Sequence, residues 1–284
     1  MNNLELFQKE KKFLVCIDSD GCVMDSMNRK HEEFFAPALI EIWNLHEYAS
    51  IVKQKWNRIN LYSKTRGINR FLGLTLILEE LQNEQIPMQD YRVVEEWTSN
   101  AEVLSNEALM EYLESTSFDD EARERSLKRT LAWSKLVNER IQADPCMVRP
   151  FTEVKDTLKA IAAIADIAIV SSANKSALEE EWGLAGLKKY TGILCSQEEG
   201  SKTFCIGQLL NKGYIKSNAI MIGDAPGDFM AAKQNNIGFY PIIAGDEELA
   251  WKNFRMKELS FFKKGEFQKE RQKALLHKFY EGLL

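Results

Sequence analysis

The sequence predicts an α/β protein in which a parallel sheet is covered by helices on both faces, with a long helical segment inserted after the first strand. Short apolar runs without a helical period, of which 13–17 is the first, are typical of buried parallel strands. After Pro150 such runs alternate with helical segments, which is the pattern of a parallel sheet with crossover helices. Between Ser26 and about Pro145 we find no convincing strand, so the core is discontinuous in the sequence.

The inserted segment is expected to form several helices. Residues 70–81 carry an apolar stripe made of good helix formers. The residues that divide the segment are Pro37, Pro87 and the pair Asp119-Asp120. We therefore predict two domains: a core made of residues 1–25 and 147–284, and an inserted helical domain at 26–146.

The core is expected to continue beyond Pro150 as alternating helices and strands. The predicted helices are 152–165, 175–183, 203–212 and 226–235, and the predicted strands are 167–170, 192–195, 219–222 and 239–243. The C-terminal segment carries acidic and basic residues on an amphipathic pattern, so we expect a last helix packed on the outside of the core.

Composition argues against several functional classes. The 284-residue chain has a net charge of −5 and a pI near 5.5. No general electrostatic attraction to nucleic acid or to an acidic membrane surface is therefore expected. No run of about 18 apolar residues occurs, and residues 1–12 lack the apolar segment of a secretory signal. We expect a cytoplasmic protein with no nucleic-acid or membrane partner.

The cysteines are interpreted as reduced thiols. They are odd in number and form no C-x-x-C pair, and the three histidines lie far apart, so no zinc site is expected. The cysteines are Cys16, Cys22, Cys146, Cys195 and Cys205. We expect most of them to be core residues of a protein in a reducing compartment.

Polar residues follow the predicted strands at the points where each strand ends. Because ligands of parallel α/β sheets bind beyond the carboxyl ends of the strands, these residues are expected to share one site. They are Asp18 and Asp20 after the first strand, Ser171 and Ser172 after the second, Lys202 at the start of a helix, and Asp224 with Asp228 after a later strand.

This set of residue types suits phosphoryl transfer, in which positioning and charge neutralisation do most of the work. Asp18 can attack phosphorus, and Asp20 can protonate the leaving oxygen and later deprotonate water. Close packing of the aspartates would raise their pKa values unless a hard cation such as Mg²⁺ is bound. Lys202 and the Ser171 hydroxyl can hold the remaining phosphate oxygens.

Each of these features has an ordinary structural explanation when taken alone. A D-x-D-G sequence after a strand is often only a turn, and a serine pair is often a helix cap. The glycine of this sequence comes too early for an EF-hand calcium loop, and a strand precedes it. The order and placement of all four segments together favour the catalytic interpretation.

Together the segments resemble the haloacid dehalogenase superfamily. Its first motif, D-x-D-G-[TV]-[LV]-x-D-S, appears at 18–26 with Cys22 at a position where threonine or valine is usual. The second and third motifs match Ser171 and Lys202, and the G-D-x-x-x-D motif matches 223–228. The resemblance implies a Rossmann-like three-layer core. It further implies Asp18 as nucleophile, Asp20 as acid/base, and Mg²⁺ held by Asp18, the Asp20 carbonyl and Asp224 with Asp228 in support.

The resemblance also implies a reaction class. Dehalogenases of the superfamily lack a proton donor at the second aspartate, whereas this chain has Asp20, so dehalogenation is not expected. The insertion resembles the first type of helical cap, as in phosphoglycolate phosphatase and β-phosphoglucomutase, which closes over small substrates. We expect a phosphomonoester hydrolase acting on a small phosphorylated metabolite. A sugar phosphomutase and a catalytically inactive binding protein of the same fold stay open as alternatives.

A basic stretch in the insertion is the candidate for substrate specificity. Residues 53–70 contain six basic residues and no acidic one. The sequence Gly67-Ile68-Asn69-Arg70 resembles the Gly-x-x-Arg specificity loop of such caps. We expect Arg70, with Arg66 or Lys64 beside it, to bind an anionic or hydroxyl-rich leaving group. The alternative is a solvated helix face.

Overall fold

The chain divides into two compact units. The computed structural model describes residues 3–88, 91–118, 120–144, 148–267 and 269–283. One unit, called here the core unit, contains Met1–Met27 and Val148–Leu284, and the other, the helical unit, contains Asn28–Met147. The assignment of these units as catalytic core and cap stays a prediction.

The core unit is built on a five-stranded sheet in which every neighbouring pair is parallel. The strands are β1 (Phe13–Ile17), β2 (Ala165–Val170), β3 (Ile193–Cys195), β4 (Ala219–Gly223) and β5 (Gly238–Pro241). Their order is β3-β2-β1-β4-β5, with Ile17 aligned with Ile169 on one side and with Ile222 on the other. The predicted fold class is confirmed, and β1 lies in the middle of the sheet.

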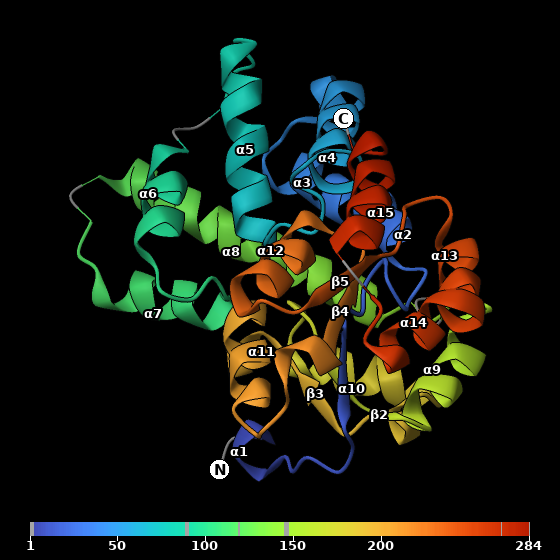
Figure 1. The fold of residues 1–284 in the computed structure, drawn as a ribbon. Helices are drawn as coiled ribbons and strands as arrows, with labels where there is room; N and C mark the ends of the chain where they lie inside the picture. The colour runs from blue at the N-terminus through green and yellow to red at the C-terminus, as the bar shows by residue number, and fades with distance from the viewer. Residues whose placement is uncertain (1–2, 89–90, 119, 145–147, 268, 284) are drawn as a thin grey trace. The chain divides into compact units, whose positions relative to one another are not determined.

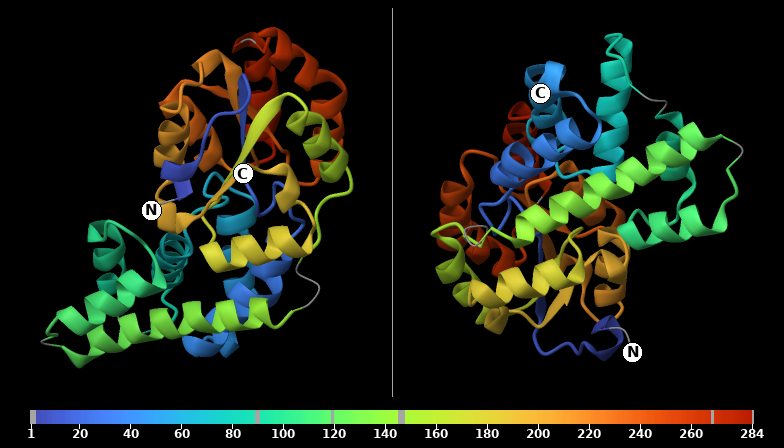
Figure 2. Two further views of the ribbon diagram at one scale, coloured as in Figure 1. Left: turned by 90° about the horizontal axis from the view of Figure 1, so that it is seen from below. Right: turned by 180° about the vertical axis from the view of Figure 1, so that it is seen from behind.

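Helices cover both faces of this sheet, as Figures 1 and 2 show. Alternate strand residues belong to two hydrophobic clusters, as the two-residue period of a strand requires. Val15 and Ile167, for example, pack with α9 (Val154–Ala162), α10 (Lys175–Leu184) and α13 (Glu247–Asn253). Cys16 and Ala168 pack with α11 (Lys202–Leu210) and α12 (Pro226–Asn235). The remaining α-helices among the described residues of the core unit are α1 (Asn3–Leu6), α14 (Leu259–Lys264) and α15 (Lys269–Glu281).

Strand β2 starts before the predicted residue 167 and includes a buried aspartate. The Asp166 carboxylate accepts hydrogen bonds from the backbone N–H groups of Glu10 and Lys11, at 3.0 and 2.8 Å, and from the Tyr214 hydroxyl. These donors compensate for burial of the charge. Asp166 therefore anchors the chain that leads into β1.

The helical unit contains only helices and turns among its described residues. Its elements are α2 (Met27–Arg29), which begins at the last core-unit residue before the insertion, a π-helical turn (Lys30–Phe35), α3 (Ala36–Ile42), a 3-10 turn (His46–Tyr48), α4 (Ala49–Leu61), α5 (Arg70–Asn83), α6 (Arg92–Asn100), α7 (Asn106–Ser115) and α8 (Glu121–Gln142). A separate hydrophobic core joins them, with Trp56 and Trp133 in edge-to-face contact at its centre. The predicted absence of strands in this segment is confirmed for the residues described.

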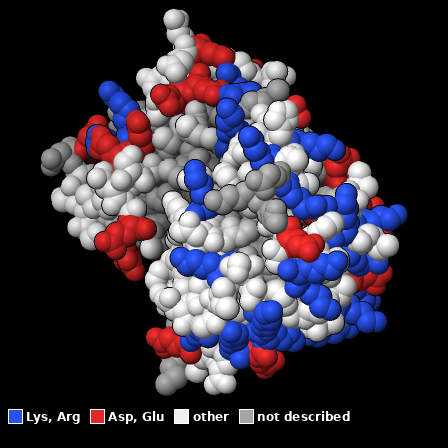
Figure 3. Space-filling model, in the orientation of Figure 1, with Lys and Arg blue, Asp and Glu red and all other residues white. Residues whose placement is uncertain are grey.

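The surface carries charges of both signs. Figure 3 shows lysine and arginine side chains over α9, α13 and α14, with acidic side chains among them. Within the described part of the chain, no helix combines the length and the apolar character needed to cross a bilayer. Cys16, Cys22, Cys195 and Cys205 are buried free thiols, as predicted, and Cys146 lies outside the described residues.

Candidate active site

The first aspartate lies at the carboxyl end of the central strand. Directly after β1, the Asp18 backbone N–H donates to the Ile222 carbonyl at 3.0 Å, so Asp18 is held beside the end of β4. The following residues, 18–26, are called here the motif loop. Gly21 has φ of 75°, a conformation that favours glycine, and its N–H donates to the Met24 carbonyl at 2.9 Å. The loop therefore turns back immediately after the two motif aspartates.

Two further aspartates come from the neighbouring strand and helix. Asp224 follows β4 directly, and Asp228 lies in the first turn of α12. Its Oδ2 accepts from the Ala225 N–H at 3.0 Å, which caps the helix. A Cβ built on Gly223 would overlap the Asp228 carboxyl group, so only glycine allows this close approach.

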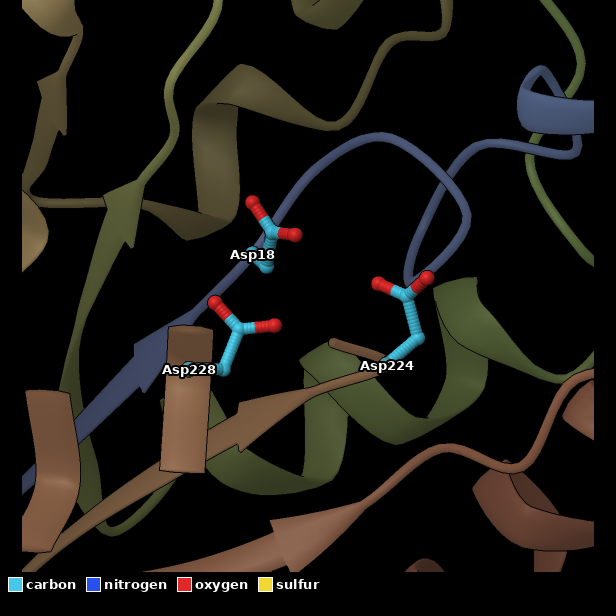
Figure 4. A group of neighbouring side chains, drawn as sticks. All are labelled: Asp18, Asp224 and Asp228. Carbon is cyan, nitrogen blue, oxygen red and sulfur yellow. The ribbon is translucent and has the colours of Figure 1, made fainter. Parts of the chain in front are cut away.

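These segments place three carboxylates in one cluster. Oxygen atoms of Asp18, Asp224 and Asp228 lie within 4.8 Å of one another, and Figure 4 shows the side chains converging from the ends of β1 and β4 and from α12. All three residues are buried, with exposed fractions of 6%, 1% and 0%. Such proximity is unfavourable without compensating positive charge.

Lys202 supplies part of that charge. It is the first residue of α11, which packs beside α12, and its Nζ lies 2.8 Å from Asp18 Oδ1 and 2.6 Å from Asp228 Oδ1. Although burial acts to lower it, the pKa of Lys202 is raised by these two carboxylates, so the ammonium form is favoured. With every group ionised, three carboxylates and one ammonium leave a net charge of −2.

Burial, together with this residual negative charge, changes the pKa values in the cluster. Burial raises the pKa of Asp18 to about 7, the Asp228 charge adds to the increase, and Lys202 opposes it. Burial also raises the pKa of Asp228 against the opposing effect of Lys202, with Asp224 adding to the rise. Burial and the charge of Asp224 raise the pKa of the adjacent Cys22 thiol, so this thiol is held neutral and is a poor nucleophile.

The donor set suits a small divalent cation. The three residues offer only carboxylate oxygens, which Mg²⁺ prefers over nitrogen or sulfur ligands. A dication would neutralise the charge of −2 that remains after Lys202 is counted. Asp18, Asp224 and Asp228 are therefore the residues that would hold Mg²⁺.

The other residues predicted for this site occupy the same edge of the core unit. One Asp20 oxygen accepts from the Ser26 hydroxyl at 2.6 Å, and Asp20 itself is half-buried. Ser171 follows β2 and is buried, and its hydroxyl oxygen accepts from the Ala173 N–H at 3.1 Å. Ser172 is exposed. The substrate-binding roles of both serines stay predictions.

The basic residues predicted for specificity are bound within the helical unit. The Arg70 guanidinium lies over the Phe35 ring and donates to the Ser134 hydroxyl at 3.1 Å and to Asn138 Oδ1 at 2.6 Å. Arg66 is buried and donates to the Leu61 carbonyl at 2.9 Å. Both arginines thus have structural contacts, and their role toward substrate stays a prediction.

Three residues near the motif loop were not assigned a role from the sequence. Ser26 is the last residue of the first motif, so the motif already marked its position. Its hydroxyl donates a hydrogen bond to Asp20, which explains why the motif contains a serine there. The indole N–H groups of Trp182 and Trp251 donate to Ser19 Oγ and to the Cys22 carbonyl. These partners are separated by 163 and 229 residues, and no local pattern marks them.

Comparison with protein-family models matches residues 88–242 to the haloacid dehalogenase-like hydrolases. The matched segment is more than half of the chain and includes Ser171, Lys202, Asp224 and Asp228, whereas Asp18 lies outside it. No curated protein matches the chain.

Two solved structures share the fold. A haloacid dehalogenase-like family hydrolase from Xanthomonas campestris is 15% identical, with a TM-score of 0.50, over 91% of this chain and 97% of that one. A protein from Bacteroides fragilis described as a haloacid dehalogenase-like hydrolase is 12% identical, with a TM-score of 0.51, over 84% of this chain and 93% of that one. The family-model match, supported by this shared fold, shows that the chain belongs to the haloacid dehalogenase-like hydrolases.

Proposed function

We propose that the protein is a Mg²⁺-dependent phosphomonoester hydrolase that acts on a small phosphorylated metabolite through an aspartyl-phosphate on Asp18. One observation carries this proposal: Asp18, Asp224 and Asp228 form a buried carboxylate cluster that Lys202 only partly neutralises. The charge of −2 that remains at this site would be neutralised by one bound dication. The dication and the Lys202 ammonium would then be the positive groups that attract a phosphate dianion.

In the proposed reaction, the Asp18 carboxylate attacks phosphorus, and the bond from phosphorus to the leaving oxygen breaks. Asp20 gives its proton to that oxygen, and the product alcohol leaves. Asp20 then takes a proton from water, whose oxygen attacks the aspartyl-phosphate and releases inorganic phosphate together with the free carboxylate. When bound, Mg²⁺ supplies charge neutralisation for the phosphoryl oxygens.

The other chain groups have supporting roles in this proposal. Lys202 holds the Asp18 carboxylate in place through its 2.8 Å ion pair and favours its ionised form. Asp228 positions the Lys202 ammonium at 2.6 Å and is also one of the three carboxylates that would hold the metal. Ser171 is proposed to bind a phosphate oxygen, and the helical unit is proposed to serve as a cap that excludes water.

The test is release of inorganic phosphate from a panel of small phosphorylated metabolites, with Mg²⁺ and with excess chelator. Release should require Mg²⁺ and should be abolished by Asp18→Asn, because an amide does not attack phosphorus. Asp20→Asn should slow alkyl phosphates far more than activated aryl phosphates such as 4-nitrophenyl phosphate, whose leaving group needs little protonation. Normal turnover by a folded Asp18→Asn variant would refute the mechanism.

The same assay separates the two alternatives. A hydrolase releases one phosphate for each substrate molecule consumed, whereas a sugar phosphomutase consumes substrate without accumulating phosphate. An inactive binding protein would bind Mg²⁺ and phosphate analogues but consume nothing. The presence of Asp20 supports the two enzymatic alternatives over the binding protein. Its hydrogen bond to Ser26 holds a group able to transfer protons close to the end of β1, where Asp18 lies.

A further inference from the structure

Two buried indole groups donate hydrogen bonds to the motif loop from helices distant in sequence. Trp182, on α10, donates from Nε1 to Ser19 Oγ at 2.9 Å. Trp251, on α13, donates from Nε1 to the Cys22 backbone carbonyl at 2.7 Å. Both tryptophans are fully buried, as are both acceptor residues.

The two acceptors lie on either side of Asp20 in the chain. Ser19 separates Asp18 from Asp20, and Cys22 follows the Gly21 turn directly. Asp18 itself is held by the backbone bond to Ile222, so its position is determined by the sheet. Asp20 lies beyond the last residue of β1 and forms an isolated parallel bridge with Met24 of the same loop.

The rest of the motif loop is held by bonds within itself and by backbone bonds to residues 149–151. The Asp25 N–H donates to the Arg149 carbonyl at 2.8 Å, and the Phe151 N–H donates to the Val23 carbonyl at 3.1 Å. The N–H groups of Val23 and Met24 both donate to the Ser19 carbonyl, at 2.8 and 2.9 Å. The internal bonds fix the shape of the loop, and the bonds to residues 149–151 hold its end beyond Asp20, at Val23 and Asp25. The indole bonds join the loop to α10 and α13, and the Cys22 side chain packs with both indoles in the same hydrophobic cluster.

From this geometry we propose that Trp182 and Trp251 are positioning residues, which hold the motif loop so that Asp20 is placed correctly relative to Asp18. The proposal rests on the proposed function, in which Asp20 transfers a proton. Proton transfer requires hydrogen-bond contact with the leaving oxygen, and a displacement of about 1 Å is enough to cost roughly 100-fold in rate.

A purely structural explanation has to be excluded, because any buried indole N–H needs an acceptor. Trp133 gives a matched control in the helical unit. Its Nε1 donates to the Phe35 carbonyl at 3.2 Å, and it is also fully buried. Phenylalanine at any of the three positions keeps an aromatic ring and removes the N–H donor, so the three variants lose the same kind of bond.

The test compares Trp182→Phe, Trp251→Phe and Trp133→Phe with the wild type on two probes of similar size. Phenyl phosphate has a leaving group that needs a proton, whereas 4-nitrophenyl phosphate has one that does not. For Trp182→Phe and Trp251→Phe we expect kcat to fall about tenfold or more on phenyl phosphate and less than about threefold on 4-nitrophenyl phosphate. KM should change little on either probe. Trp133→Phe should leave both rates unchanged.

A second measurement does not depend on activity. Amide hydrogen exchange of a peptide covering 18–26 should become about tenfold faster or more in Trp182→Phe and Trp251→Phe, and should not change in Trp133→Phe. If a phenylalanine variant does not fold, an isosteric benzothiophene analogue of tryptophan removes the N–H without a cavity, and Ser19→Ala removes the acceptor of Trp182.

The outcomes separate the two proposals. Equal losses on both probes, or no loss on either, would overturn the positioning role, and so would unchanged exchange in the motif loop. A wild-type protein that releases phosphate from neither probe nor any member of the metabolite panel would refute the proposed function instead, while the exchange measurement still decides whether the indoles restrain the loop.

Discussion

Replacing Asp18 by asparagine should stabilise the protein in the absence of divalent metal, and the gain should grow as the pH rises from 5 to 7.5. In the folded protein, burial and the Asp228 charge raise the pKa of Asp18 to about 7, compared with an ordinary value of 3.8. Between these two values the folded chain keeps the proton and the unfolded chain loses it. Stability therefore falls as the pH rises through this window and levels off above pH 7.

The magnitude follows from the pKa difference. A shift of one pKa unit corresponds to about 1.4 kcal/mol, so the rise from 3.8 to about 7 costs the metal-free wild type about 4 kcal/mol above pH 7. At pH 5, which lies about 1.2 units above the ordinary pKa of 3.8, the destabilisation of the wild type is only roughly 2 kcal/mol. An amide at this position does not titrate. The stability advantage of Asp18→Asn should therefore grow by about 2 to 3 kcal/mol from pH 5 to 7.5.

Urea unfolding of both proteins in chelator, followed by circular dichroism at pH 5, 6, 7 and 7.5, measures this difference. Adding Mg²⁺ at pH 7.5 should reduce the difference between the two proteins, because a ligand at 100 times its Kd stabilises the wild type by about 2.7 kcal/mol. The variant has one carboxylate fewer and should gain less. Parallel pH dependence of the two proteins in chelator would refute the inference that the cluster is destabilising without metal.

Three further predictions test the site and the specificity of the protein. Asp224→Ala should weaken Mg²⁺ binding about tenfold or more, measured by calorimetry, whereas Ser171→Ala should change it little. If Asp224→Ala kept full activity in excess chelator, the assignment of Asp224 as a metal ligand would be wrong. Gly223→Ala should displace the Asp228 carboxyl and lower both thermal stability and phosphate release, so a variant with wild-type values would disprove the close approach. Arg70→Ala should raise KM for the physiological substrate about tenfold or more, equivalent to about 1.4 kcal/mol, with little effect on an aryl phosphate. Equal effects on both substrates, together with a lower melting temperature, would assign Arg70 a structural role only.

Local sequence patterns determined the elements and the site composition. The strand Phe13–Ile17 and the helix Pro226–Asn235 were predicted with their observed bounds, because an apolar run and a proline at a helix start act over a few residues. The expected convergence of Asp18, Lys202, Asp224 and Asp228 also followed from the sequence, since polar residues at the carboxyl ends of parallel strands share an edge.

The tertiary structure decided the interactions that connect distant residues. The strand order places β1 between β2 and β4, and this puts Asp18 beside Asp224. Arg70, expected to face a substrate, has partners on α8 that no spacing indicated. The hydrogen bonds from Trp182 and Trp251 to the motif loop were likewise not indicated by any local sequence pattern. Periodicity records which face of an element is buried, whereas the partner of a buried polar group depends on how whole elements pack together.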